Sequence, residues 1–149
     1  MSFLSAFNTS VSGMTAQLQR VNTISENIAN AETTRTPQGG PYRRREVILA
    51  SVANDRTFEE ELLSQDRSVS TSTEVKVVGI VQDERPPILR FEPGHPDANE
   101  EGYVEMPNVN IMEEMVNLMS ANRSYEANTA AFNATKNMVQ SALDLGRNA

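Results

Sequence analysis

The single histidine of the chain is the clearest candidate for acid–base chemistry. His95 stands between two prolines in the segment Pro93-Gly94-His95-Pro96-Asp97. An imidazole can transfer protons near neutral pH, but a general base also needs a reacting group held within hydrogen-bond reach. No recognisable motif ties a serine, lysine or carboxylate to His95. We therefore interpret His95 as a turn residue and predict that the chain has no catalytic residues and is not an enzyme.

A pattern similar to a calcium-binding loop follows this histidine. Asp97, Asn99 and Glu101 place oxygen atoms at alternate positions, and Gly102 provides the glycine that permits the turn. The bidentate acid expected at the twelfth position is missing, because Asn108 stands there. The chain also has no cysteine, which excludes thiolate ligands and disulfides. We therefore predict neither a bound metal nor a cofactor.

The strongest basic run is Arg43-Arg44-Arg45, which Glu46 follows directly. On a strand, successive side chains point to opposite faces, so the run would not form one basic surface. The whole chain carries a formal net charge of −7, whereas proteins that bind nucleic acid present a clustered basic face. We expect ion pairs between these arginines and a neighbouring subunit, and no nucleic-acid partner. Because no apolar run approaches the length of a bilayer span, we expect no membrane insertion.

A long helix is predicted from Asn108 to Leu145, where the sequence contains neither glycine nor proline. Apolar residues recur there at the three and four spacing of a coiled-coil seam. The seam residues are Ile111, Met115, Leu118, Tyr125, Phe132 and Val139. A second face carries small side chains at Ala127, Ala131 and Ala134. With seven charges from residue 108 to the end, this helix is expected to pack against neighbours on more than one side.

A second helix is predicted near the N-terminus by the same spacing. Its apolar positions are Leu4, Phe7, Val11, Met14, Leu18, Val21 and Ile28. Gly13 interrupts the pattern at a cost of about 1 kcal/mol relative to alanine, so the helix needs packing to persist. We predict that the two terminal helices pair.

The middle of the chain has the composition of a small wet β segment. We predict a loop over 33–41, a strand over 42–52, a mobile surface loop near 53–74, and a further short strand over 103–105. Two β-prone runs, 75–81 and 88–92, are separated by Asp83 and Pro86-Pro87 and are predicted to pair as a hairpin. The predicted fold class is therefore α+β. We assign residues 1–31 and 108–149 to a helical domain and 32–107 to a small outer segment.

The end of the N-terminal helix is a candidate contact site between subunits. Helical periodicity stops after Ile28, so Asn27 and Asn30 stand in a final turn whose carbonyls lack helical partners. An asparagine amide can donate to such carbonyls or bridge to another subunit, and Ala29 leaves room for a close neighbour. The alternative is that Asn30 is merely a helix cap.

The segment Ser25-Glu26-Asn27-Ile28-Ala29-Asn30-Ala31-Glu32-Thr33-Thr34 resembles the N-terminal signature of bacterial flagellar rod and hook proteins. In that family, a helix ends in Asn-Ile/Leu-Ala-Asn before a turn that contains threonine. Most members continue with Gly-Tyr/Phe-Lys/Arg, whereas this chain continues from Arg35 through Gly39-Gly40 to Arg43. This departure points within the family to a rod member, as do the segments 92–96, 102–109 and 119–125.

The resemblance implies structural work in the flagellar basal body. Members of the family are exported through the flagellar type III apparatus and polymerise with copies of themselves and with other rod proteins, forming the rod that crosses the periplasm. It also implies export without a cleavable signal peptide, which fits a first basic residue at Arg20 with no apolar segment before it. The alternative interpretation is a soluble cytoplasmic coiled-coil adaptor that binds a single partner.

Overall fold

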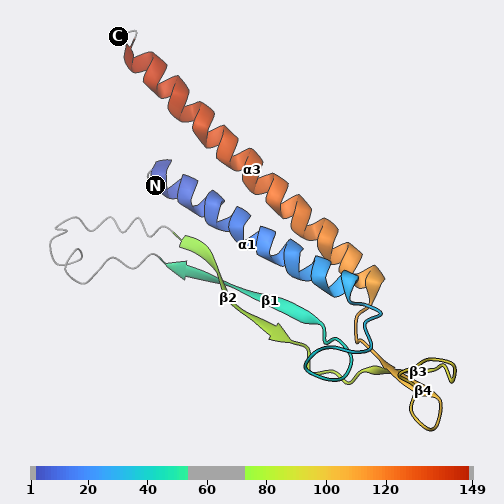
Figure 1. Cartoon of the computed structure of the whole chain (residues 1–149). Helices are drawn as coiled ribbons and strands as arrows, with labels where there is room; N and C mark the ends of the chain where they lie inside the picture. Colours follow the sequence, from blue (N-terminus) through green and yellow to red (C-terminus); the bar gives the residue numbers. More distant parts are fainter. Residues whose placement is uncertain (1–2, 54–72, 148–149) are drawn as a thin grey trace, which may run out of the picture.

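The structure is a computed structural model that describes residues 3–53 and 73–147 of the 149. It is an elongated α+β molecule (Figure 1). Along the chain, one long helix comes first, two small antiparallel β ribbons follow, and a second long helix comes last. Helix α1 spans Phe3–Ala29 and helix α3 spans Ile111–Arg147. They run antiparallel side by side, so that both ends of the described chain lie at one end of the molecule (Figure 1). The predicted pair of terminal helices is confirmed.

Local hydrogen bonds explain where the helices begin and end. Asn110 caps α3, because its Oδ1 accepts hydrogen bonds from the backbone N–H of Met112 at 3.1 Å and of Glu113 at 3.5 Å. The acidic first turn of α3 suits the positive end of the helix dipole. At the end of α1, the Asn30 amide donates to the carbonyl oxygen of Glu26 at 2.9 Å. Asn30 thus satisfies a terminal carbonyl of its own helix. This contact agrees with the alternative that Asn30 is a helix cap.

Small and polar residues form the closest contacts between the helices. The buried residues of α1 are Ser10, Gly13, Ala16, Thr23, Ile24 and Asn27, and those of α3 are Glu114, Ala121 and Thr135. A Cβ atom at Gly13 would lie 2.9 Å from Nδ2 of Asn128 on α3. Nearer the N-terminus, the rings of Phe7 and Phe132 meet edge to face at 4.9 Å. Small side chains therefore let the two backbones approach closely, while long apolar side chains lie at the margins of the contact.

The first ribbon consists of β1 (Arg45–Ala53) and β2 (Thr73–Gln82), paired antiparallel from Arg45 opposite Gln82 to Ala53 opposite Thr73. The register shifts between Ile48 and Leu49. The ribbon lies along α1 (Figure 1), and the backbone N–H of Val75 donates to Oγ of Ser12 at 3.2 Å. The strand predicted over 42–52 is confirmed with a later start. Ala53, Thr73 and Glu74 belong to strands, and the rest of the predicted mobile loop, 54–72, lies outside the described residues.

The second ribbon consists of β3 (Ile88–Phe91) and β4 (Tyr103–Met106), and it lies at the end of the molecule away from the termini (Figure 1). We call residues 88–106 the finger. The predicted hairpin between 75–81 and 88–92 is wrong, because β2 pairs with β1 and β3 pairs with β4. Pro86 and Pro87 lack backbone N–H donors and separate β2 from β3. The strand predicted over 103–105 is confirmed.

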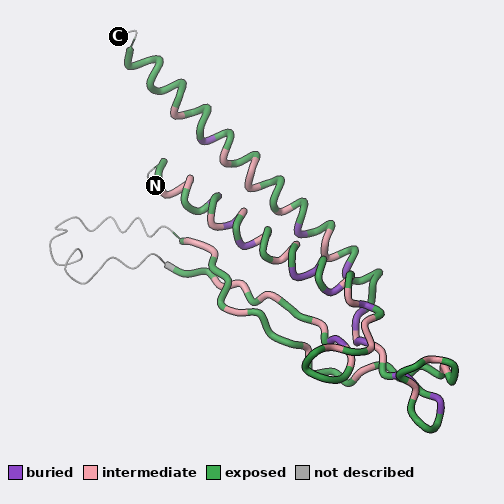
Figure 2. Tube along the Cα trace, viewed as in Figure 1, coloured by how far each residue is buried: buried purple, intermediate pink, exposed green. Residues whose placement is uncertain are grey.

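The buried core is small and lies where the helices meet the β segments (Figure 2). Ala31, Tyr42 and Val109 form its cluster, and Val104 is buried nearby. Most other large apolar side chains of the described residues are exposed, particularly along both helices. No described helix is long and apolar enough to cross a membrane. Among the described residues, more large apolar side chains are exposed than buried.

Candidate functional site

A buried polar network joins both helices to the first ribbon, and Asn27 is its centre. The Asn27 side chain is fully buried. Its Nδ2 donates to the carbonyl oxygen of Arg45 at 2.8 Å and to Oε2 of Glu114 at 2.9 Å. Its Oδ1 accepts from the Tyr42 hydroxyl and from the backbone N–H of Arg45, each at 2.9 Å. All four hydrogen-bonding positions of the amide are thus used within the chain, and the structure places Asn27 inside its own subunit.

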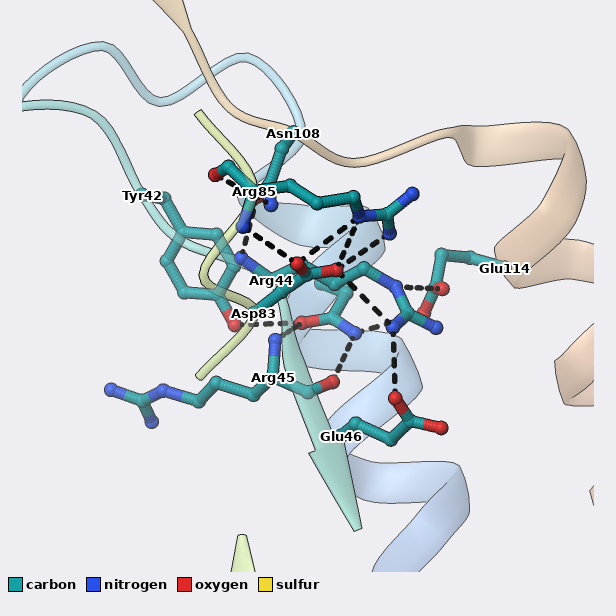
Figure 3. A network of polar contacts seen from close by, with 9 residues as sticks. Tyr42, Arg44, Arg45, Glu46, Asp83, Arg85, Asn108 and Glu114 are labelled. Carbon is teal, nitrogen blue, oxygen red and sulfur yellow. Dashed lines mark hydrogen bonds and ion pairs between the residues drawn. The ribbon is translucent and has the colours of Figure 1, made fainter. Parts of the chain in front are cut away.

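An ion pair between Glu114 and Arg44 completes this junction (Figure 3). Nε of Arg44 lies 2.8 Å from Oε1 of Glu114, and the two side chains are 11% and 1% exposed. Burial alone would lower the pKa of Arg44, but the hydrogen bonds and charges of Glu114 and Glu46 together outweigh it, so this pKa is raised. For Tyr42, burial raises the pKa of the hydroxyl, and the nearby positive charge of Arg45 opposes this shift only in part. Arg44 remains charged and Tyr42 neutral, as their roles in the network require.

A turn after β2 holds the outer side of Arg44 (Figure 3). The backbone N–H of Asp83 donates to the carbonyl oxygen of Arg44 at 2.8 Å, and Arg85 pairs with the Asp83 carboxylate. The hydrogen bond from Arg85 lowers the pKa of Asp83 from 3.8 to about 2. Because the folded-state pKa is depressed, the stabilisation is complete above pH 3.8 and is lost as pH falls through about 2. Asn108 adds a further link, since its Oδ1 accepts from the backbone N–H of Arg44 at 3.0 Å.

The three arginines of the basic run alternate in exposure. Arg44 is half-buried in the junction, while Arg43 and Arg45 are exposed. Arg45 forms a looser pair with Glu26 at 3.6 Å and lies over the Tyr42 ring. Arg44 is thus committed to contacts within its own chain, and Arg43 and Arg45 stay available to a neighbour.

The predicted interface residues fall into three groups by exposure. Asn27 is buried. The half-buried residues are Phe7, Met14, Val21, Ile28, Asn30, Leu118, Phe132 and Val139. The exposed residues are Leu4, Val11, Leu18, Ala29, Ile111, Met115, Tyr125, Ala127, Ala131 and Ala134. The exposed group lies along both helices, on faces that the helix pair leaves uncovered.

Sequence reasoning missed Glu114, Tyr42 and Asp83 as members of the junction. One signal was available, because Glu114 shares a seven-residue spacing with Ala121, Asn128 and Thr135. A carboxylate in such a stripe of small and uncharged residues needs a cationic partner when it is buried. The junction contains no nucleophile with an adjacent base. Among residues 3–53 and 73–147, no group of three or more His, Asp or Glu residues could hold a metal ion.

Comparison with known proteins shows which family this chain resembles. Residues 7–35 match the family described as flagella basal body rod protein, and residues 100–145 match the C-terminal family of the flagellar basal body rod proteins FlgEFG. The flagellar basal-body rod protein FlgC of Borreliella burgdorferi is 42% identical over 147 residues, which cover 96% of this chain and 97% of that protein. The chain belongs to the flagellar basal-body rod protein family. FlgC of Bacillus subtilis is 43% identical over 152 residues, covering 99% of this chain and 100% of the relative.

Family membership makes the chain a structural subunit of the basal-body rod, similar to FlgC. The chain therefore resides in the flagellar basal body and assembles with other rod components. The matched segments coincide with α1 and its following turn, and with β4 and α3. The interpretation as a cytoplasmic adaptor is not supported by these similarities.

Proposed function

We propose that this rod protein polymerises helically with its own copies and with other rod proteins into the proximal rod, and that it transmits torque through many packed contacts without catalysing a reaction. In this proposal, residues 1–31 and 108–149 form the axial helical domain. Residues 32–107 form the outer segment, from which Arg43 and Arg45 reach a neighbouring subunit. The rod would lie in the periplasm, reached through the flagellar type III apparatus without a cleavable signal peptide.

The observation that carries the proposal is the apolar surface left open on both helices. Leu4, Val11 and Leu18 follow one another every seventh residue on α1 and are 68%, 45% and 52% exposed. On α3, the exposed apolar residues include Met115, Val116 and Met138. A row of exposed apolar side chains along a helix favours an interaction site over a free surface.

The weakly charged helices support the same conclusion. Residues 1–30 carry one positive and one negative charge, and residues 108–149 carry three and four. A long helix bathed in water would normally carry charges over its outer face. The middle segment, with nine positive and fifteen negative charges, has the composition of a hydrated surface. This contrast supports helices inside the polymer and an outer segment facing water.

A charge placed on the open face of α3 tests the proposal. Ala127→Glu and Ala134→Glu each introduce a carboxylate into an apolar stripe that subunits are proposed to bury, where an unpaired charge costs several kcal/mol. We expect both variants to be absent from purified basal bodies and motility to be lost. The matched control is Asn133→Glu, which adds the same charge to the same helix on its polar side and is expected to assemble. Normal assembly of both alanine variants would contradict the proposal.

A further inference from the structure

The finger is the part of the molecule least supported by its own chain. Among the described helices and strands, β3 and β4 pack against each other alone. Its turn is also held to the rest of the chain by a hydrogen bond from Thr34 Oγ1 to Oδ2 of Asp97 at 2.8 Å. An isolated two-stranded ribbon is marginally stable in water. A finger of this kind gains stability when another surface covers it.

One face of the finger is open and apolar. Residues directly opposite each other in an antiparallel pair share a face, so Phe91 with Tyr103 and Leu89 with Glu105 define this one. Leu89, Phe91 and Tyr103 are 62%, 62% and 40% exposed. The two rings meet at 5.3 Å, and the Phe91 ring lies so close to Gly102 that an added Cβ would approach it to 3.0 Å. The aromatic pair is therefore held in place before any partner arrives.

The finger is also acidic. Its residues 88–106 contain Glu92, Asp97, Glu100, Glu101 and Glu105, against Arg90 as the one Lys or Arg. Arg90 already pairs with Glu92 at 2.9 Å. Glu100 and Glu101, in the turn between the strands, form no ion pair with the described part of the chain. A surface that combines apolar and cationic groups would complement this face and its turn.

The loop 35–43 has that chemistry. Arg35 and Arg43 stand at its ends, are exposed, and have no ion-pair partner within residues 3–53 and 73–147. Pro37 and Pro41 lie between them. Backbone hydrogen bonds between Thr36 and Gly40 and between Gly39 and Thr36, each 2.9 Å, hold the loop in one shape. The loop is thus an ordered surface with prolines flanked by two cations.

Within one subunit, this loop borders the finger at Asp97, Asn99, Tyr103 and Glu105. Glu105 lines a cleft of about 140 Å³ together with Arg43, and another of about 300 Å³ together with Arg35. Glu100 and Glu101 line neither cleft. The loop and the finger lie at the same end of the molecule (Figure 1). Glu100 and Glu101 are therefore left without a partner by the loop of their own chain.

We propose that the finger of one subunit docks on the loop 35–43 of a neighbouring copy. The Leu89, Phe91 and Tyr103 face covers the loop prolines, while Glu100 and Glu101 pair with Arg35 and Arg43. The two surfaces differ, so the contact is heterologous and repeats along an assembly instead of closing into a two-fold dimer. This inference rests on the proposed self-assembly and adds an outer contact to the axial one.

Cross-linking between two differently marked copies tests this contact, because the natural chain has no cysteine. One copy carries Pro96→Cys in the finger turn, and the other, lengthened by a tag, carries Gln38→Cys in the loop. Both positions are exposed, and neither belongs to the proposed ion pairs. A short bismaleimide applied to basal bodies from cells that express both copies should yield a dimer of mixed size. A dimer containing both cysteines can form only between subunits.

A second cysteine pair separates this contact from the axial assembly. Leu18→Cys and Ala127→Cys, on the open faces of α1 and α3, report helical packing between copies. Cross-links at the helices without any at the finger would overturn the finger contact and leave self-assembly intact. Absence of both would overturn both proposals. A cross-link from Pro96→Cys to a different protein would show that another partner covers the finger, and would also overturn the contact with a second copy.

Charge reversal tests the proposed ion pairs. Changing Glu100 and Glu101 to lysine in all copies places like charges against Arg35 and Arg43 and should reduce the finger cross-link about tenfold. Adding Arg35→Glu and Arg43→Glu to the same chain restores opposite charges and should restore the cross-link. An undiminished cross-link in the first variant, or no recovery in the second, would show that these charges do not meet.

Discussion

The most constrained residues of the molecule are polar. Glu114 is buried against Arg44, and Asn27 fills the remaining contact of the carboxylate. Replacing a buried ion pair with apolar residues is often harmless, so its presence does not prove that it adds stability. Removing one partner is different, because the other charge is left buried and uncompensated. The junction is thus best understood as a device that fixes how three chain segments meet.

Glu114→Gln should therefore destabilise the subunit strongly. The substitution keeps the side-chain shape but removes the negative charge, leaving the Arg44 guanidinium without its closest counter-charge. We expect the free energy of unfolding to fall by about 3 kcal/mol, measured by urea denaturation of the purified chain. Glu113→Gln is the matched control, because Glu113 is its exposed neighbour, and a change within about 0.5 kcal/mol is expected there. Equal effects of both variants would show that the ion pair contributes nothing specific.

At the scale of the elements, the helix pair leaves little room for a side chain at Gly13. Helix propensity and packing oppose each other at this position. An alanine would favour the helix by about 1 kcal/mol, but its Cβ would lie 2.9 Å from Nδ2 of Asn128. The amide is the far end of a side chain and can move aside, so the two effects nearly cancel. A branched residue adds more atoms than a shift of the Asn128 amide can accommodate.

Gly13→Ala is accordingly expected to change the free energy of unfolding by less than about 1 kcal/mol, whereas Gly13→Val should lower it by about 1 to 3 kcal/mol through overpacking. The double variant Gly13→Val with Asn128→Ala makes room for the added methyl groups and should recover part of the loss. A double-mutant cycle measures this recovery. Additive effects of the two substitutions would mean that residues 13 and 128 do not pack together.

The sequence contained the elements but not their contacts. The spacing of Leu4 to Ile28 and of Ile111 to Val139 predicted both helices, because a period near 3.6 residues directly reflects helical geometry. It did not reveal that Gly13 and Ala121 are buried in the folded chain while Leu4 and Leu18 stay exposed. An apolar stripe looks the same whether a helix of its own chain or another subunit covers it. The pairing of β2 with β1 was missed for a related reason, since strand partners across 54–72 leave no local signal.

At the scale of the whole molecule, the helices differ in length, and α3 extends past the described part of α1 (Figure 1). Phe7 contacts Phe132 near the start of α1, so the last turns of α3 have no described helix beside them. All residues from Gln140 to Arg147 are exposed, including Leu143 and Leu145. These turns contribute little to the subunit alone and offer a contact to the assembly.

Removing the chain from Gln140 onward should separate folding from assembly. We expect the free energy of unfolding of the purified chain to change by about 0.5 kcal/mol or less, since the removed residues are exposed. Incorporation into basal bodies should nevertheless be lost. Leu143→Ser with Leu145→Ser should reproduce this loss, while Gln140→Ser with Asp144→Ser should not. Wild-type incorporation of the shortened chain would show that the projecting turns have no neighbour.

The partners of the junction lie far apart along the chain, so the junction can form only after a long stretch of the chain is present. Asn27 and Glu114 are 87 positions apart in sequence, and the first ribbon, which Arg44 and Asp83 flank, lies between them. A nascent or fragmented polypeptide that lacks any one of these stretches cannot close the junction, whatever helices it forms locally. Closure thus reports that the polypeptide from Asn27 to Glu114 is present, and products of translation or proteolysis that lack part of this stretch would lack the rigid junction.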